Sequence, residues 1–138
     1  MLSASSGTAY TKSPPKKVIL DSHHWDRYDL NLYYRGKKLF LELCECTDGP
    51  DGEDQKEIGQ WAFCSGSRHL ERVRVEGGLT IDVAYRPAHI AVNFSKNSTN
   101  GFLRRFINSM DRVHWSEYQL RPDGMVSIKR PREEIVVG

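Results

Sequence analysis

Three cysteines and one histidine have the clearest metal-binding chemistry in this chain. Cys44 and Cys46 are two positions apart, and His69 follows Cys64 by five positions. Thiolates and imidazoles are ligands of tetrahedral zinc, but structural zinc sites usually take their cysteines from closely spaced turns. Side chains two apart on a strand are separated by about 6–7 Å, which suits a shared ion poorly. We expect the cysteines to be small apolar side chains and expect no metal or cofactor; a zinc site is the alternative.

Two adjacent histidines form a second candidate site, in the segment His23-His24-Trp25-Asp26. Paired imidazoles beside a carboxylate can transfer protons or bind a metal ion. The chain has no phosphate-binding glycine loop, zinc-protease helix, nucleophile elbow or dinucleotide fingerprint. We therefore expect a non-catalytic protein, in which Trp25 packs against a sheet. An enzyme that uses these histidines or the cysteines is the alternative.

Basic and aromatic side chains form the third group and are the candidate binding residues. Arg72 and Arg74 alternate on one predicted strand and therefore share a face. Such side chains suit single-stranded nucleic acid, through phosphate pairing and base stacking, and they are also enriched at protein interfaces. The candidate partner-binding residues are Arg68, Arg72, Arg74, Arg104, Arg105, Arg112, Tyr33, Lys37 and Lys38.

The elements that carry these residues are mostly strands, because apolar and polar side chains alternate along much of the chain. Residues 79–85 are the clearest case, since Leu79, Ile81, Val83 and Tyr85 share one face there. Short turn-forming pairs such as Gly77-Gly78 separate neighbouring strand patterns and predict hairpins. A series of hairpins predicts a mostly antiparallel, strongly curved sheet or partly open barrel of about seven to eight strands.

Two segments depart from the alternating pattern. Apolar side chains that include Phe102, Phe106 and Met110 recur at three and four residues, which places them on one helical face. We expect an amphipathic helix at about 101–114 that packs on the sheet, and hence an α+β fold. The acidic stretch 47–57 has no apolar side chain, and we expect it to be a loop.

The length of 138 residues corresponds to a single domain. Residues 1–16 predict a flexible basic arm, residues 17–132 a single β-rich domain, and residues 133–138 a C-terminal tail that frays. The formal charge of +2 is too small to indicate nucleic acid by itself. We see neither a membrane-spanning apolar run nor a signal peptide, and so we expect a cytoplasmic protein with reduced thiols and no membrane partner.

These patterns together predict a non-catalytic binding module of a regulatory or accessory kind. Its basic arm and acidic loop suggest a protein partner or assembly with further copies of the same chain. A protein that binds single-stranded nucleic acid through the sheet and helix arginines is the alternative.

Overall fold

The structure is a computed structural model that describes residues 14–49, 52–63, 68–75, 79–96 and 114–138. Its strands form two antiparallel meanders, in which each strand pairs with its neighbours in sequence. The four-stranded sheet contains β1 (Lys17–Trp25), β2 (Tyr28–Arg35), β3 (Lys38–Gly49) and β4 (Gly52–Ala62). The six-stranded sheet contains β5 (His69–Arg74), β6 (Leu79–Arg86), β7 (His89–Lys96), β8 (His114–Leu120), β9 (Val126–Arg130) and β10 (Glu133–Val137).

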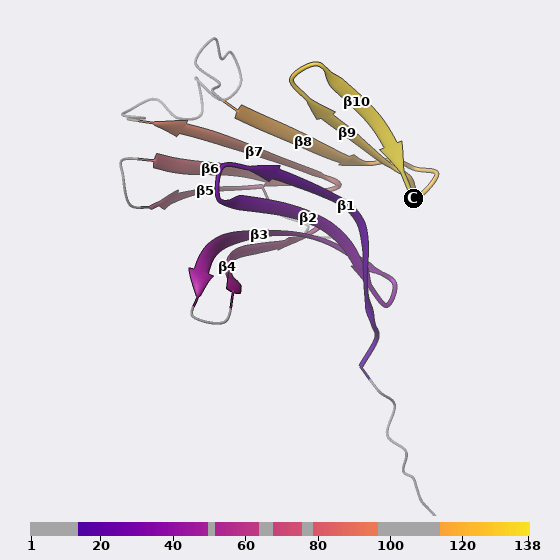
Figure 1. Cartoon of the computed structure of the whole chain (residues 1–138). Coiled ribbons are helices and arrows are strands. Elements are labelled where there is room, and N and C mark those ends of the chain that lie inside the picture. Colours follow the sequence, from indigo (N-terminus) through magenta and orange to yellow (C-terminus); the bar gives the residue numbers. More distant parts are fainter. Residues whose placement is uncertain (1–13, 50–51, 64–67, 76–78, 97–113) are drawn as a thin grey trace, which may run out of the picture.

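The two sheets pack face to face and enclose one apolar core. Figure 1 shows β1–β4, in indigo to magenta, below β7–β10, in orange to yellow. Alternation decides which side chains enter the core, since Leu30 and Leu32 on β2 face inward, as do Leu41 and Leu43 on β3. The six-stranded sheet adds inward-facing side chains from its central strands, namely Ile81, Val83, Ile90, Val92, Phe94, Tyr118, Val126 and Ile128.

The antiparallel prediction is confirmed, whereas the α+β class is wrong. The described residues form no helix and two sheets that are not closed into a barrel, so the fold is all-β there. Of the predicted helix at 101–114, residues 101–113 lie outside the described residues, and His114 begins β8. Each sheet covers the apolar face of the other, which is the role that we had assigned to the helix.

Two further expectations are corrected at the sheet margins. The stretch 47–57, expected to be a loop, continues β3 to Gly49 and enters β4 at Gly52. The tail at 133–138, expected to fray, contains β10, which pairs with β9 from Glu133 to Val137. Of the predicted basic arm, residues 1–13 lie outside the described residues, and residues 14–16 precede β1 as exposed chain without a strand.

A strained turn joins the sheets on the side of β4. Ala88, between β6 and β7, has a φ of 64°, which is unusual for a residue that is not glycine. Its amide donates to the Phe63 carbonyl at 3.1 Å, and its carbonyl accepts from the Leu120 amide at 2.8 Å. These two bonds link the chain after β4 and the end of β8 to one turn, which offsets the cost of the backbone conformation.

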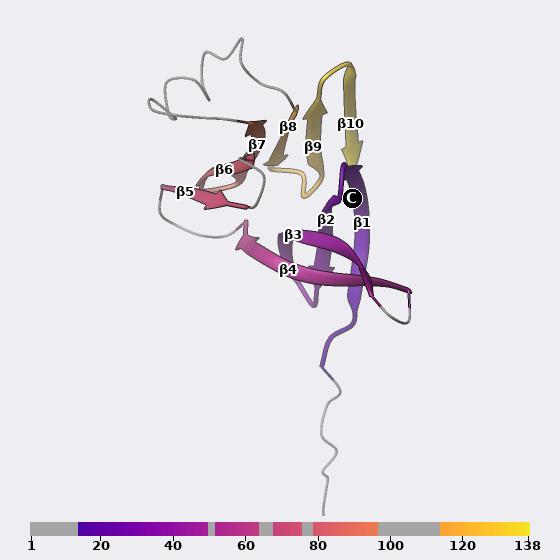
Figure 2. The same cartoon turned by 60° about the vertical axis from the view of Figure 1, so that its left-hand side comes forward.

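The open edges of the two sheets carry the large apolar side chains that remain exposed. Among the described residues these are Val18 and Ile19 on β1, Leu70 on β5 and Val136 on β10. All three strands lie at a sheet edge, as the turned view in Figure 2 helps to follow. Edge strands present unpaired backbone groups, so an exposed apolar side chain there marks a surface that another chain can use.

Candidate functional site

The structure places three of the predicted arginines on or beside β5. Arg68 directly precedes this edge strand, and Arg74 ends it; both are exposed. Neither of these two arginines forms an ion pair or side-chain hydrogen bond with the described residues. Between them, Leu70 is 43% exposed. Two cations that pair with none of the described residues therefore flank an exposed apolar side chain along one sheet edge.

Arg72 differs from its two neighbours because it forms an internal ion pair. Its Nε donates to Asp82 Oδ1 at 2.7 Å, and its Nη2 donates to Asp82 Oδ2 at 3.2 Å. Asp82 stands opposite Arg72 on β6 and is buried. Such a bidentate pair fixes the guanidinium and satisfies a carboxylate that would otherwise be costly to bury. Arg72 therefore stabilises the β5–β6 pairing.

The remaining predicted residues do not join the β5 surface. Lys37 and Lys38 are exposed at the turn between β2 and β3, on the other sheet. Tyr33, predicted to face away from the core, does lie on the outer face of its sheet, but it is buried. Its ring lies under the Lys17 ammonium at 4.6 Å and parallels Phe40 with centroids 5.4 Å apart. The three predicted helix arginines lie outside the described residues, namely Arg104, Arg105 and Arg112.

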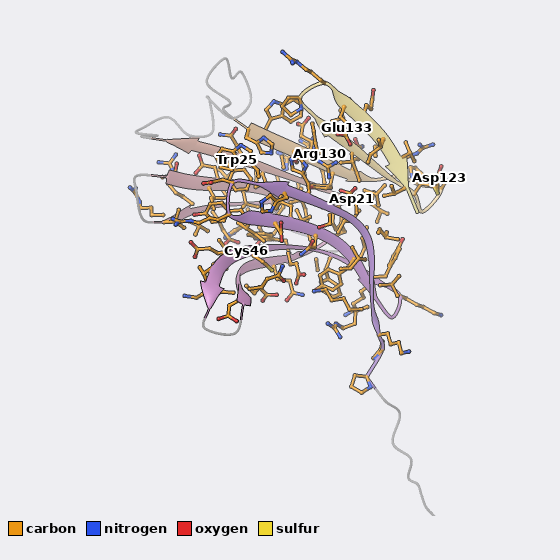
Figure 3. The ribbon with its side chains drawn as sticks, in the orientation of Figure 1. Asp21, Trp25, Cys46, Asp123, Arg130 and Glu133 are labelled. Atoms are coloured by element: carbon orange, nitrogen blue, oxygen red, sulfur yellow. The ribbon has the colours of Figure 1, made fainter. Side chains whose placement is uncertain are left out.

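A second group of side chains lies where β1 faces the six-stranded sheet. We call it the inter-sheet polar cluster, and it consists of Asp21, His23, His114, Arg130 and Glu133. The Arg130 side chain is only 4% exposed and forms ion pairs with Asp21 and with Glu133, the latter at 3.2 Å. Figure 3 shows Asp21 on β1 and Arg130 and Glu133 at the β9–β10 hairpin. One buried cation thus holds two carboxylates from different sheets.

The two histidines of the cluster contact each other across the sheets. The Nε2 atoms of His23 and His114 are 2.6 Å apart, and the ring planes are parallel within 3°. Trp25 packs against His114, with centroids 5.1 Å apart, and against Phe94, with centroids 5.0 Å apart. A contact between two ring nitrogens requires one donor and one acceptor, so at least one imidazole must be neutral.

The surroundings of both rings disfavour the charged form. Burial, together with smaller contributions from the neighbouring His23 and Arg130, lowers the pKa of His114 to about 4. Burial also lowers the pKa of His23, with a smaller contribution from Arg130; Asp21 and Glu133 act in the opposite direction. Both histidines are therefore neutral near pH 7.

Three buried donor groups lie beside this cluster. The Ser116 and Tyr118 hydroxyls and the Arg130 Nε form no hydrogen bond of normal geometry within the described residues. Ser116 and Arg130 nevertheless both face the Tyr118 hydroxyl. Buried polar groups whose hydrogen bonds are poorly formed cost free energy. Their concentration in one place makes the cluster a functional-site candidate.

Two of the three cysteines lie on the outer face of the four-stranded sheet. Cys44 and Cys46 are both buried there, two residues apart on β3. Burial raises the pKa of the Cys44 thiol to about 11, with a further contribution from Glu42. The Cys46 thiol donates to Asp29 Oδ2 at 3.2 Å. A protonated thiol is a poor nucleophile and a poor metal ligand, which agrees with the interpretation of these cysteines as small buried side chains.

The metal hypothesis finds no geometric support in the described part of the chain. There, no three side chains of histidine, cysteine, aspartate or glutamate converge in a way that could hold an ion. His69 lies instead beside Glu71 and Tyr85 on the six-stranded sheet. Cys64, the remaining ligand that we considered, lies outside the described residues.

Fold and site together describe a two-sheet antiparallel β protein with a basic open edge and a titratable contact between its sheets. Comparison of the chain with protein-family models, with curated proteins and with solved structures gives no match. In the described ranges, no helix has the length and the apolar character that a transmembrane span needs.

The sequence indicated part of this site. Alternation along β1 places Asp21, His23 and Trp25 on one face, because each is two residues from the next. The partners of Asp21 and His23 stand 109 and 91 residues further along the chain. A single sequence carries no signal for contacts of that separation.

Proposed function

We propose that the protein is a non-catalytic protein-binding module that receives its partner along β5. The partner segment is extended, acidic and contains an apolar side chain. The observation that carries this proposal is the position of Arg68 and Arg74, two cations without partners among the described residues, on either side of the exposed Leu70. An acidic strand would neutralise both arginines and cover the leucine.

The edge position of β5 supports strand addition as the binding mode. Within the described residues β5 pairs with β6 on one side only. An incoming strand gains affinity from main-chain hydrogen bonds to such an edge, and specificity from alternate side chains. The other edges with exposed aliphatic side chains are less suitable. The second half of β1 packs against the other sheet, and the two glutamates of β10 pair with Arg130 and Lys129.

Charge favours a different protein over a second copy of the same chain. Two β5 strands in antiparallel contact would bring Arg68 and Arg74 of one copy close to the same arginines of the other. Like charges on paired strands destabilise the pairing. An acidic partner meets no such repulsion, and its approach is accelerated by the opposite charge.

Nucleic acid is less well supported than a protein partner. Sequence-tolerant binding of single strands needs exposed aromatic rings as well as cations. Tyr33, the aromatic side chain proposed for stacking, is buried on the other sheet, and Arg72 is held by Asp82. The arginines that remain at the edge suit carboxylates as well as phosphates, whereas the exposed Leu70 suits a peptide side chain.

The test compares two variants of equal charge. Arg68→Glu/Arg74→Glu alters β5, and Lys37→Glu/Lys38→Glu makes the same change of charge at the β2–β3 turn. The probe is an array of short synthetic peptides in which acidic and branched aliphatic residues alternate, with thymidine oligonucleotide as a second probe. Retained cooperative melting shows that each variant folds.

We expect the parent to bind acidic peptides, and we expect the β5 variant to bind them at least about tenfold more weakly, because two attractive contacts become repulsive. The turn variant should bind within about threefold of the parent, since only distant charge changes. Equal binding by both variants would overturn the proposal. Binding of oligonucleotide but not of peptide, lost in the β5 variant, would replace the protein partner by nucleic acid.

A further inference from the structure

We infer that the inter-sheet polar cluster is an acid-sensitive latch, in which the His23–His114 contact holds β1 against the six-stranded sheet and double protonation releases it. The latch joins β1 to β8, β9 and β10, at the end of the six-stranded sheet away from β5, and the inference does not depend on the proposed binding function. It concerns how tightly the edge strand β1 is held to the rest of the molecule.

The geometry of the histidine pair is the first step. A distance of 2.6 Å between the two Nε2 atoms leaves room for one proton between them. This geometry fits a pair in which both rings are neutral or a pair in which one ring is charged. It cannot hold two imidazolium ions, because both nitrogens would then point a proton at the other ring. The first protonation is therefore tolerated as a shared proton, and the second one breaks the contact.

The charges around the pair make the second protonation costly. His24 and Asp21 stand near His23 on β1, while Arg130 and Glu133 face it from β9 and β10. Ser116 and Tyr118 on β8 contribute hydroxyl groups to the same region. Both carboxylates are already bound to Arg130. When both imidazoles are charged, the cluster changes from one net negative charge to one net positive charge.

The position of the pair links this change to a movement. Beyond the hairpin with β2, three sets of described side-chain contacts hold β1: the cluster, Trp25, which packs on His114 and Phe94, and Leu20, which packs on the apolar core before the cluster begins. Repulsion between the two rings would therefore weaken the hold on the second half of β1. Release would expose Trp25 and the ring of Phe94 to water.

The test is hydrogen exchange of the β1 amides between pH 8 and pH 5, with each rate divided by the intrinsic rate at that pH. A pKa of about 4 in the closed state and 6.5 in the open state makes opening about 30-fold more favourable at pH 5. We expect protection of the Asp21–Trp25 amides to fall by about that factor. Protection of β6 and β7 should change much less.

Three variants assign the effect. His114→Gln removes the ring whose pKa is lowered to about 4 and keeps a polar side chain, so the pH dependence of β1 protection should largely disappear. His23→Gln removes the second ring but leaves His114 buried, so the pH dependence should become smaller. His24→Gln is the matched control, since His24 contacts Asp29 on the outer face at 2.5 Å and should retain the full effect. Unchanged pH dependence in both the His23 and His114 variants would overturn the latch.

A second measurement needs no variant. The ring protons of the five histidines can be titrated by nuclear magnetic resonance in the parent protein. Burial lowers the pKa of His89 as well as the pKa values of His23 and His114. We expect the His23 and His114 rings to titrate below pH 6.5 in a mutually dependent way, and the His89 ring to titrate independently of them. Independent titration of all five rings near pH 6.5 would refute the latch, even if the variants failed to fold.

Discussion

Replacing Arg130 tests the central electrostatic contact between the sheets. Arg130→Met keeps the length of the side chain but removes the charge that pairs with Asp21 and Glu133. The Asp21 side chain is 14% exposed, and the Glu133 side chain is 49% exposed. Glu133 can therefore turn into water, whereas Asp21 stays in place as an uncompensated charge. Removing one partner of a buried ion pair lowers the free energy of unfolding by about 3–5 kcal/mol. Because only Asp21 is left buried without its partner, we expect Arg130→Met to cost about 3 kcal/mol, the lower end of that range.

A double-mutant cycle separates the pair from simple loss of packing. Asp21→Asn leaves Arg130 paired with Glu133 and should cost about 1.5 kcal/mol, the value of one charged hydrogen bond. Asp21→Asn/Arg130→Met strands no carboxylate and should cost about 2 kcal/mol. The two single changes sum to about 4.5 kcal/mol, so the coupling free energy is about 2.5 kcal/mol.

Urea unfolding at pH 7.5, followed by tryptophan fluorescence, gives all four free energies of unfolding. Lys129→Met is the matched control on the same strand, because Lys129 forms an exposed pair with Glu134 at 3.9 Å. That change should lie within about 0.5 kcal/mol of the parent. The electrostatic account fails if Arg130→Met costs no more than the control, or if the two single changes are additive.

Three further predictions follow from single groups. The pKa of His114 is 6.5 in the unfolded chain and about 4 in the folded one. The neutral ring therefore contributes about 3 kcal/mol to the free energy of unfolding above pH 6.5, and this contribution is lost as the pH falls toward 4. Urea unfolding across that range should show the decline, and a constant free energy of unfolding would contradict it. A pKa of about 11 in place of 9.0 makes the Cys44 thiolate about 100-fold scarcer at pH 8. Alkylation of Cys44 in the folded protein, followed by peptide mass spectrometry, should therefore be at least that much slower than alkylation of the protein unfolded in urea. Equal rates would exclude a buried thiol. A Cβ on Gly59 would overlap the buried Trp61 ring, so Gly59→Ala should lower the free energy of unfolding by about 1–3 kcal/mol. The control Lys56→Ala changes an exposed residue of the same strand and should cost about 0.5 kcal/mol or less. Equal effects of the two changes in thermal unfolding would show that the ring moves aside.

Most strands could be predicted from the sequence because a strand with one buried face reveals itself by alternation. The predicted pattern at 79–85 falls on β6, and Ile81 and Val83 from that pattern are core residues. The segments that we misinterpreted lie at the margins. The hairpin of β3 and β4 extends through the acidic stretch 47–57, and β10 is an edge strand. β10 buries only one short apolar pair, Ile135 and Val137, which is too brief a pattern to predict a strand at the end of the chain.

The fold class was wrong because we counted too few sheets. We expected a single curved sheet, whose apolar face must pack against another element. The helical periodicity of residues 102–113 led us to assign that role to a helix. In the described part of the chain, the four-stranded and the six-stranded sheet instead bury each other's apolar faces. Periodicity identifies which side chains are buried, but it does not identify the element that buries them. The cytoplasmic location and the protein partner stay predictions.

The two sides of the sandwich are closed by different chemistry, and this separates the two proposals. On the β5 side, the Trp61 indole donates to Glu71 at 3.0 Å, and backbone bonds join Phe63 to the Ala88 turn. The His69 Nε2 atom lies 3.8 Å from the same Glu71 oxygen, so protonation of His69 would add an attraction there instead of a repulsion. On the β1 side, the contact depends on His23 and His114. Acid should therefore loosen β1 while β5 stays ordered.

This asymmetry predicts a double dissociation between the two sets of variants. His114→Gln should remove the pH dependence of β1 exchange and leave acidic-peptide binding unchanged at neutral pH. Arg68→Glu/Arg74→Glu should weaken peptide binding and leave β1 exchange unchanged. If either variant alters both properties by a comparable factor, the two sides are coupled through the shared core. The sandwich would then have to be treated as one cooperative unit instead of two independent edges.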